Sequence, residues 1–78
     1  MPEPPWKRIT IEDIRESLAQ IEQVYRDVYV LHAFDQLSYE EIAERLSIER
    51  ITVGTRLSRA RKRLREVLVK RFGLEDEP

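Results

Sequence analysis

Between Pro5 and Gly73 the chain contains no proline and a single glycine, Gly54. Proline and glycine are the residues that most readily end or weaken a helix, so almost nothing in this stretch interrupts helical structure. Apolar residues recur there at spacings of three and four, which is the period of an amphipathic helix and not of a strand. The sequence therefore predicts an all-α protein.

The chain has 78 residues, which is enough for one domain with a thin core. We expect an extended lead-in over residues 1–10, a single helical domain over residues 11–73 and an acidic tail over residues 74–78. No apolar run is long enough for a membrane helix, and the N-terminus lacks the apolar core of a signal peptide. We therefore expect a cytoplasmic protein with no membrane contact.

The residue types needed for catalysis or metal binding are missing or isolated. Cysteine is absent and the only histidine is His32, so neither a disulfide nor a metal site is expected. The sequence also lacks a Ser/His/Asp arrangement and a glycine-rich phosphate loop. We expect a protein that is not an enzyme and that uses no cofactor.

Charge is distributed very unevenly along the chain. The total net charge is −1, yet residues 1–49 carry −6 and residues 50–71 carry +8. The second segment holds nine basic side chains against Glu66 alone. Such segregation creates a positive local field that the total conceals, and it is typical of a helix that binds nucleic acid. A solvated helix face is the alternative interpretation.

Capping residues and apolar periodicity divide the chain into four helices. Thr10 with Asp13, and Ser38 with Glu41, resemble capping boxes, each at the start of a helix. Gly73 is expected to end the last helix as its C′ residue. The predicted elements are helices near 11–21 and 22–34 with a bend between them, a turn at 35–37, a third helix from Ser38, a connection at 47–49, and a last helix from Arg50 to about Phe72.

Two helices joined by about three residues, the second one basic, are typical of a helix-turn-helix, which we place at about 38–72. Ala43 is small where the two helices must approach closely, so we expect it to be buried together with Val53. One stripe of the last helix is predicted to face the core: Val53, Leu57, Ala60 and Leu64, extended by Val67. The opposite stripe is expected to enter a major groove: Ile51, Thr55, Ser58, Arg59 and Lys62.

The stretch "LSYEEIAERLSIERITVGTRLSRARKRLRE", preceded by "YRDVYVLHAFDQ", resembles region 4 of bacterial sigma factors, and of the extracytoplasmic-function (ECF) group in particular. The resemblance implies a four-helix domain that binds the upstream (minus-thirty-five) promoter element through its last helix and docks on the flap of RNA polymerase. Sigma factors also carry a promoter-melting domain, which has no counterpart in these residues. We therefore expect an excised piece or a stand-alone relative of region 4, and Met1 favours the latter.

An ungapped alignment with the family pattern assigns roles to residues of the last helix. Gly54 stands where the family has a lysine or arginine that contacts DNA, and Ile51 replaces the usual glycine. Thr55 matches the family's serine, and Arg59 matches a basic position that faces DNA. Arg56 and Arg61 match positions on the flanks, where phosphates run. The complete predicted DNA-binding set is Arg50, Thr52, Thr55, Arg56, Ser58, Arg59, Arg61 and Lys62.

These side chains suit different parts of a DNA duplex. Arg59 can bind a guanine through two hydrogen bonds, while Thr55 and Ser58 can contact bases or phosphate. Arg50 and Thr52, near the start of the helix, are expected to hold phosphate.

Two functions are compatible with this sequence. The first is a DNA-binding transcription regulator that acts on double-stranded promoter DNA and on RNA polymerase. The alternative is an interaction module that docks on the RNA polymerase core or on an anti-sigma factor and reads few bases. Gly54, Ile51 and the acidic N-terminal half favour the alternative, because Gly54 marks either a lost DNA contact or a close approach by another backbone. A homodimer formed through the helix near 11–21 is left open.

Overall fold

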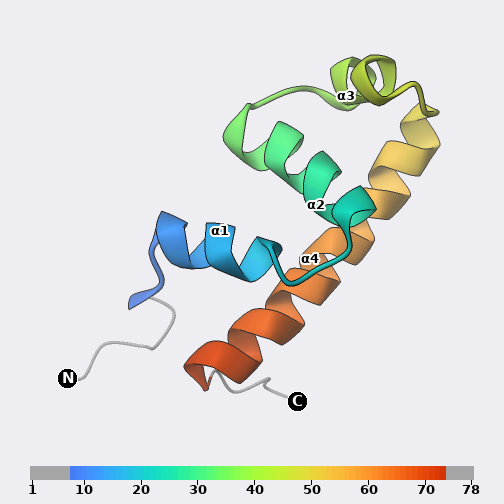
Figure 1. The fold of residues 1–78 in the computed structure, drawn as a ribbon. Coiled ribbons are helices and arrows are strands. Elements are labelled where there is room, and N and C mark those ends of the chain that lie inside the picture. Colours follow the sequence, from blue (N-terminus) through green and yellow to red (C-terminus); the bar gives the residue numbers. More distant parts are fainter. Residues whose placement is uncertain (1–7, 74–78) are drawn as a thin grey trace.

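The computed structural model describes residues 8–73, which form helices and connecting turns without a strand (Figure 1). The predicted all-α, four-helix architecture is confirmed. Residues 1–7 of the expected lead-in and the whole expected acidic tail, residues 74–78, lie outside the described residues. In chain order the elements are α1 (Ile11–Leu18), α2 (Gln23–Tyr29), the π-helical turn η2 (Val30–Phe34), α3 (Tyr39–Leu46) and α4 (Arg50–Phe72).

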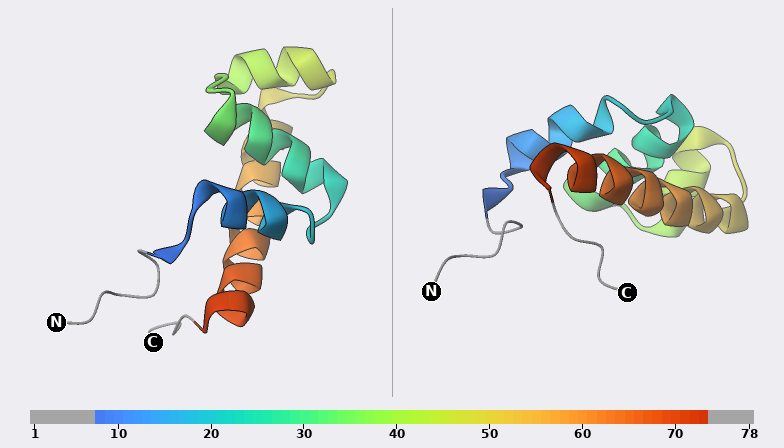
Figure 2. Two further views of the ribbon diagram at one scale, coloured as in Figure 1. Left: turned by 60° about the vertical axis from the view of Figure 1, so that its left-hand side comes forward. Right: turned by 90° about the horizontal axis from the view of Figure 1, so that it is seen from below.

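The long helix α4 contacts each of the other α-helices, and α1, α2 and α3 lie against one side of it (Figure 2). Its 23 residues span about 35 Å at 1.5 Å per residue. Helix α3 packs near the N-terminal end of α4, and α1 packs against its C-terminal half. Helix α2 crosses α4 between them.

The core consists of two clusters arranged along α4. The cluster on the α3 side contains the buried residues Val28, Ile42, Val53 and Leu57. The cluster on the α1 side contains the buried residues Leu18, Ile21, Ala60 and Leu64. The predicted apolar stripe of the last helix is therefore confirmed, and Val67 extends it as a partly buried residue.

Ala43 differs from the prediction, because it is only partly buried. It packs against the α3-side cluster, which contains Val53 as expected. Ile42 occupies the centre of the inward face of α3 and is fully buried. Ala43 follows it about 100° further around the helix and so lies at the edge of that face.

Both predicted capping boxes are present. The Thr10 hydroxyl accepts a hydrogen bond from the Asp13 N–H (3.1 Å), and the Asp13 carboxylate accepts one from the Thr10 N–H (2.9 Å). At the start of α3 the corresponding distances between Ser38 and Glu41 are 3.1 and 2.8 Å. Each box satisfies two backbone donors that would otherwise lack partners, which fixes where α1 and α3 begin. The last helix ends at Phe72, and Gly73 follows it in the left-handed conformation (φ 64°), as predicted.

The first two helices end earlier than predicted. Helix α1 stops at Leu18, and the Gln20 and Ile21 N–H groups then bond to carbonyls only three residues back, which tightens the chain into a turn. The expected helix over 22–34 changes at Val30 into η2, where the Asp35 N–H bonds to the Val30 carbonyl, five residues back (3.1 Å). Apolar periodicity signals a helix but does not distinguish the hydrogen-bonding partners within it.

The pKa of Glu41 lies below its ordinary value of 4.5, chiefly because its carboxylate accepts the backbone hydrogen bond of Ser38. A lowered folded-state pKa means that this contribution to stability is complete above the ordinary pKa and is lost as the pH falls through the folded-state pKa. We therefore expect Glu41→Gln, which cannot ionise, to be less stable than the wild type at pH 7, and we expect this difference to shrink as the pH falls from 7 to about 3. Urea denaturation at the two pH values measures this difference. An equal gap at both pH values would contradict the assignment.

Two aliphatic residues of α4 test the core assignment directly. Leu57 is 1% exposed, whereas Ile51 is 77% exposed. Leu57→Ala should lower the free energy of unfolding by about 2–5 kcal/mol, because it removes buried methyl groups and leaves a cavity. Ile51→Ala should change it by no more than about 0.5 kcal/mol. Chemical denaturation measures the free energy of unfolding of both variants. A similar loss of stability in the two would mean that the face of α4 assigned to the core is wrong.

Candidate nucleic-acid interface

Helices α3 and α4 are joined by a tight turn that sets the angle between them. Ser47 adopts the left-handed conformation (φ 55°, ψ 46°) directly after α3. The Ile48 N–H bonds to the Ala43 carbonyl (3.0 Å) and the Ser47 N–H to the Glu44 carbonyl (3.4 Å), which together form a Schellman motif. Ile48 packs against the α3-side cluster, so the turn is anchored to the core. The connection at 47–49 thus orients α4 relative to α3 as in a helix-turn-helix.

The first turn of α4 lacks a side-chain cap. Glu49 is the N-cap residue, but its side chain makes no capping hydrogen bond, and the first turn contains no acidic residue. The first amide groups of a helix have no partner within the helix, and they carry a partial positive charge. Thr52, predicted to hold phosphate, lies in this turn and is partly buried.

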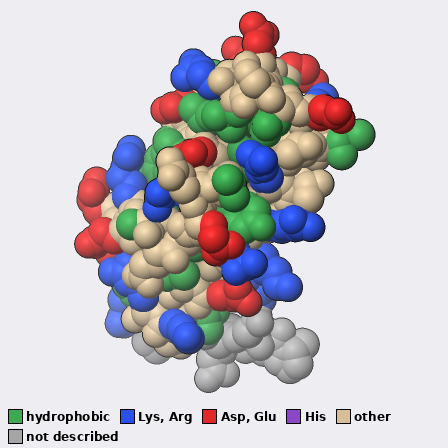
Figure 3. All heavy atoms as spheres, turned by 45° about the vertical axis from the view of Figure 1, so that its right-hand side comes forward, with side chains coloured by type: hydrophobic (Ala, Val, Ile, Leu, Met, Phe, Trp, Pro, Cys, Tyr) green, Lys and Arg blue, Asp and Glu red, His purple; other side chains and the backbone are tan. Residues whose placement is uncertain are grey.

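The predicted groove-facing stripe of α4 points away from both core clusters. All five of its members are exposed: Ile51, Thr55, Ser58, Arg59 and Lys62. Arg61 is also exposed, and Arg56 is partly buried, so they border the stripe on its two sides. Figure 3 shows several acidic side chains around the top of the molecule, where α3 lies, and a mixture of basic and acidic side chains lower down.

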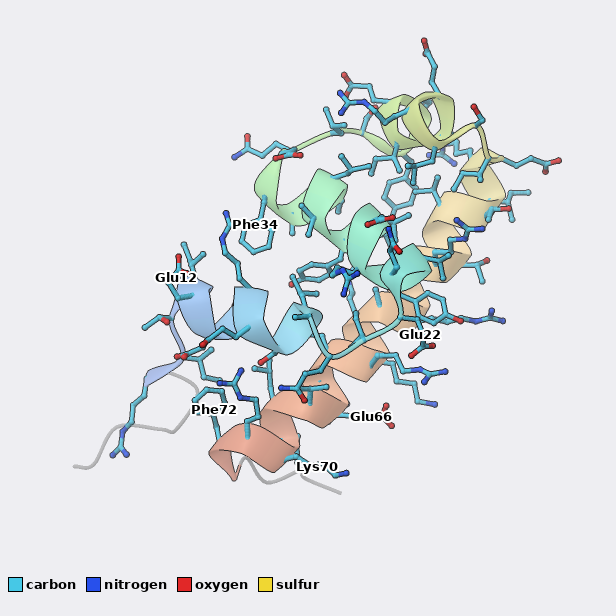
Figure 4. The ribbon with its side chains drawn as sticks, viewed as in Figure 1. Glu12, Glu22, Phe34, Glu66, Lys70 and Phe72 are labelled. Carbon is cyan, nitrogen blue, oxygen red and sulfur yellow. The ribbon has the colours of Figure 1, made fainter. Side chains whose placement is uncertain are left out.

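The basic residues of α4 fall into two groups according to their partners. Arg63 forms an ion pair with Glu22 (3.4 Å) and lies over the Tyr25 ring (5.6 Å). Glu22 stands at the start of α2 and points toward α4 (Figure 4). In contrast, the side chains of four basic residues of the predicted set make no hydrogen bond or ion pair within residues 8–73: Arg56, Arg59, Arg61 and Lys62.

Arg71 belongs to the group with structural partners, because it fastens α1 to the end of α4. Its guanidinium donates hydrogen bonds to the buried Ser17 hydroxyl (2.9 Å) and to the Asp13 carbonyl (3.3 Å). A carboxylate oxygen of Glu16 lies 3.8 Å away. Arg71 is not a member of the predicted DNA-binding set. These contacts bind its charge within the fold.

Arg50, predicted to hold phosphate, already has a partner. Its Nε donates to the Glu40 carboxylate at 2.6 Å, and its guanidinium lies over the Tyr39 ring, 5.5 Å from the centroid. Tyr39 in turn meets the His32 ring edge to face at 5.3 Å. No short-range sequence signal indicated this arrangement, because Glu40 and Arg50 are ten residues apart on different helices.

His32 has a structural position, as its surroundings show. Its Nδ1 lies 2.9 Å from the Leu37 carbonyl, and because a carbonyl only accepts, Nδ1 carries the proton in this contact. Across residues 8–73 no three His, Cys, Asp or Glu side chains are grouped to hold a metal ion. In the same part of the chain, no helix combines the length and the apolar character needed to cross a membrane.

Comparison with known proteins agrees with this geometry. The family described as Sigma-70, region 4 matches residues 11–64, which include α1, α2, α3 and α4 as far as Leu64. The chain belongs to the sigma-70 region 4 family. This membership places it among DNA-binding domains related to transcription, with a helix-turn-helix.

A curated relative supports the same family. The RNA polymerase sigma factor YlaC of Bacillus subtilis (strain 168) is 36% identical to this chain over 64 residues. The match covers 82% of the chain and 37% of the relative, so the chain spans little more than a third of that protein's length. No solved structure shows a significant match.

Gly54 lies on the side of this region 4 domain where α4 faces Tyr39. A Cβ atom placed on Gly54 would lie 3.6 Å from Tyr39 Cε2, which is an ordinary van der Waals distance. The neighbour is a side chain of the same chain, so the fold itself does not require glycine at this position. The absence of a side chain leaves the Tyr39 ring open beside the first turns of α4.

The two glycines of this region 4 domain should respond oppositely to alanine. Gly54→Ala should raise the free energy of unfolding by about 0.5–1 kcal/mol, because alanine favours the helical backbone and its Cβ has room. Gly73→Ala should lower it by about 1–2 kcal/mol, because Gly73 has φ +64°. Thermal or urea unfolding distinguishes the two signs. A destabilised Gly54→Ala variant would mean that the surroundings of Tyr39 are tighter than described.

Proposed function

We propose that the chain is a transcription regulator that binds promoter DNA through α4. The observation that carries the proposal is a group of basic side chains that have no hydrogen-bond or ion-pair partner within residues 8–73 and lie on or beside the exposed stripe of a helix-turn-helix: Arg56, Arg59, Arg61 and Lys62. Cations without partners inside the fold are free to neutralise phosphates and release counterions. A recognition helix of this kind places its N-terminal residues at base edges in the major groove.

Some candidate residues are suited to contact bases, and others are suited to contact phosphates. Arg59 lies within the exposed stripe and has the two parallel donors that match guanine O6 and N7. Thr55 and Ser58 flank it on the same stripe and offer hydroxyls to bases or phosphate. Arg56 and Arg61 border the stripe on opposite sides, where the two phosphate backbones of a groove would run. Lys62 adds a phosphate contact one turn further along.

A second candidate function is docking on RNA polymerase or on an anti-sigma factor, or pairing with a second copy. Ile51 favours it, because an apolar side chain that is 77% exposed on the same face suits a protein surface. Ile11 of α1 is also exposed, at 61%, and would be available for self-association. The relative's name, RNA polymerase sigma factor, makes the polymerase the partner to test first.

Salt-dependent binding to duplex DNA tests the first function. Arg61→Ala should weaken binding to every duplex alike and reduce the slope of log affinity against log salt by about one unit. Arg59→Ala should weaken binding to the preferred sequence by about 1–3 kcal/mol and relax the preference at one base pair. Fluorescence anisotropy over a range of salt concentrations measures both effects.

Arg63→Ala is the matched control, since it removes a cation of the same helix whose charge is already paired with Glu22. It should leave DNA affinity nearly unchanged. If Arg59→Ala binds every duplex as the wild type does, the reading face is misplaced. If the wild type binds no duplex but binds purified RNA polymerase, and Ile51→Ala weakens that binding, the second function holds.

A further inference from the structure

Arg50 is held by more contacts than any other candidate DNA-binding residue. Glu40, on α3, accepts the hydrogen bond from Nε at 2.6 Å. Beneath the guanidinium lies the Tyr39 ring, 5.5 Å from its centroid. Both contacts come from the start of α3, whereas Arg50 is the first residue of α4. The pair therefore bridges the two helices of the helix-turn-helix at the N-terminal end of α4, which is the end that a recognition helix places at base edges.

The Tyr39 ring beneath Arg50 is itself held by a contact with His32. The Tyr39 ring meets the His32 ring edge to face at 5.3 Å, and His32 is hydrogen-bonded to the Leu37 carbonyl at 2.9 Å. Gly54, one turn after Arg50 on the same side of α4, adds no side chain over the ring. The guanidinium is thus oriented from one edge by Glu40 and from below by Tyr39.

This arrangement contributes little to stability. The Arg50 and Glu40 side chains are 63% and 67% exposed, and exposed ion pairs have small effects on folding. The pKa of Glu40 lies below its ordinary value, first because of its own backbone N–H and then because of Arg50, so the carboxylate is charged at neutral pH. The consequence of the pair is geometric: it removes the freedom of a long, flexible side chain.

The engaged donor is Nε, and neither terminal nitrogen of Arg50 donates a hydrogen bond to a partner within residues 8–73. Those two nitrogens form one edge of a planar group with parallel donors, which fits guanine O6 and N7. A phosphate contact needs only charge and tolerates a mobile side chain. A guanidinium oriented in advance loses less freedom on binding a base edge, which favours selective recognition.

We propose that Glu40 is a positioning residue and Arg50 a specificity-determining residue, which together select a guanine at the end of the bound DNA site nearest the start of α4. This inference rests on the proposed DNA-binding function. It replaces the phosphate contact expected for Arg50 with base recognition. Arg59 and Arg50, more than two helical turns apart on α4, would then read different base pairs.

The test is selection from a duplex library randomised over about 10 base pairs, one turn of DNA, followed by competition binding with an unrelated duplex. The wild type should select guanine at one position through this pair, with a discrimination of about 5- to 150-fold. Arg50→Lys should lose that preference and still bind the unrelated duplex, because lysine keeps the charge but lacks the parallel donors. Glu40→Ala should lose the same preference and bind the unrelated duplex at least as well as the wild type.

Two further variants separate positioning from charge. Glu44→Ala removes the same charge from an exposed position of α3 outside the pair and should keep the preference. Glu40→Gln retains an oxygen acceptor for Nε and should keep part of it. Circular dichroism checks that all variants remain folded, as expected from the exposure of the three altered residues.

Several outcomes would overturn the inference while leaving DNA binding intact. One is that Arg50→Lys keeps the preference for guanine. Another is that Glu40→Ala binds all duplexes more tightly with its preference unchanged, so that Glu40 only neutralises Arg50. A third is that Glu44→Ala loses the same preference. If the wild type binds no duplex at all, the proposed function fails, and this inference fails with it.

Discussion

Burial of one apolar stripe along α4 is the interaction on which the rest of the structure depends. Val53 and Leu57 complete the cluster on the α3 side, and Ala60 and Leu64 complete the cluster on the α1 side. Within residues 8–73, α4 is the only helix that contributes fully buried residues to both clusters. A domain of this size has a thin core, so losing this stripe would leave α1 and α3 connected mainly through the contacts of α2 and η2 with the two clusters. Burial of this stripe also exposes the opposite side of α4, which carries Ile51, Thr55, Ser58, Arg59 and Lys62.

The position of each arginine along and around α4 decides whether its charge is bound within the fold or remains available to a ligand. Arg63 and Arg71 lie within reach of α1 and α2, where acidic and hydroxyl side chains bind them. Arg59 and Arg61 lie on the far side, where no described residue offers a partner. A count of basic residues therefore overestimates the charge that a ligand would meet. The net charge of the chain underestimates it, because the acidic residues lie mostly on other elements.

The features that the sequence predicted well are those specified by residues close together in the chain. Each capping box involves two residues three positions apart, and the buried stripe of α4 follows from helical periodicity alone. Ser47 escaped prediction because its left-handed conformation is one that glycine usually adopts. The contact between Glu40 and Arg50 also escaped, because it depends on the angle between α3 and α4. Exposure of the candidate site was thus predictable, whereas the pairing of its arginines required the tertiary structure.

The wide turn η2 has a consequence for how this chain would align with a homologue. A π-helical turn holds one residue more than an α-helical turn over nearly the same path. It lets Val30 and Phe34 face the α1-side cluster while Leu31 faces the α3-side cluster. A homologue lacking one residue here could close the segment as an ordinary α-helix and keep the flanking helices in place. A one-residue gap at this point of an alignment would then mean that the π-helical turn has become α-helical. The residues of α4 would still align with those of the homologue's last helix.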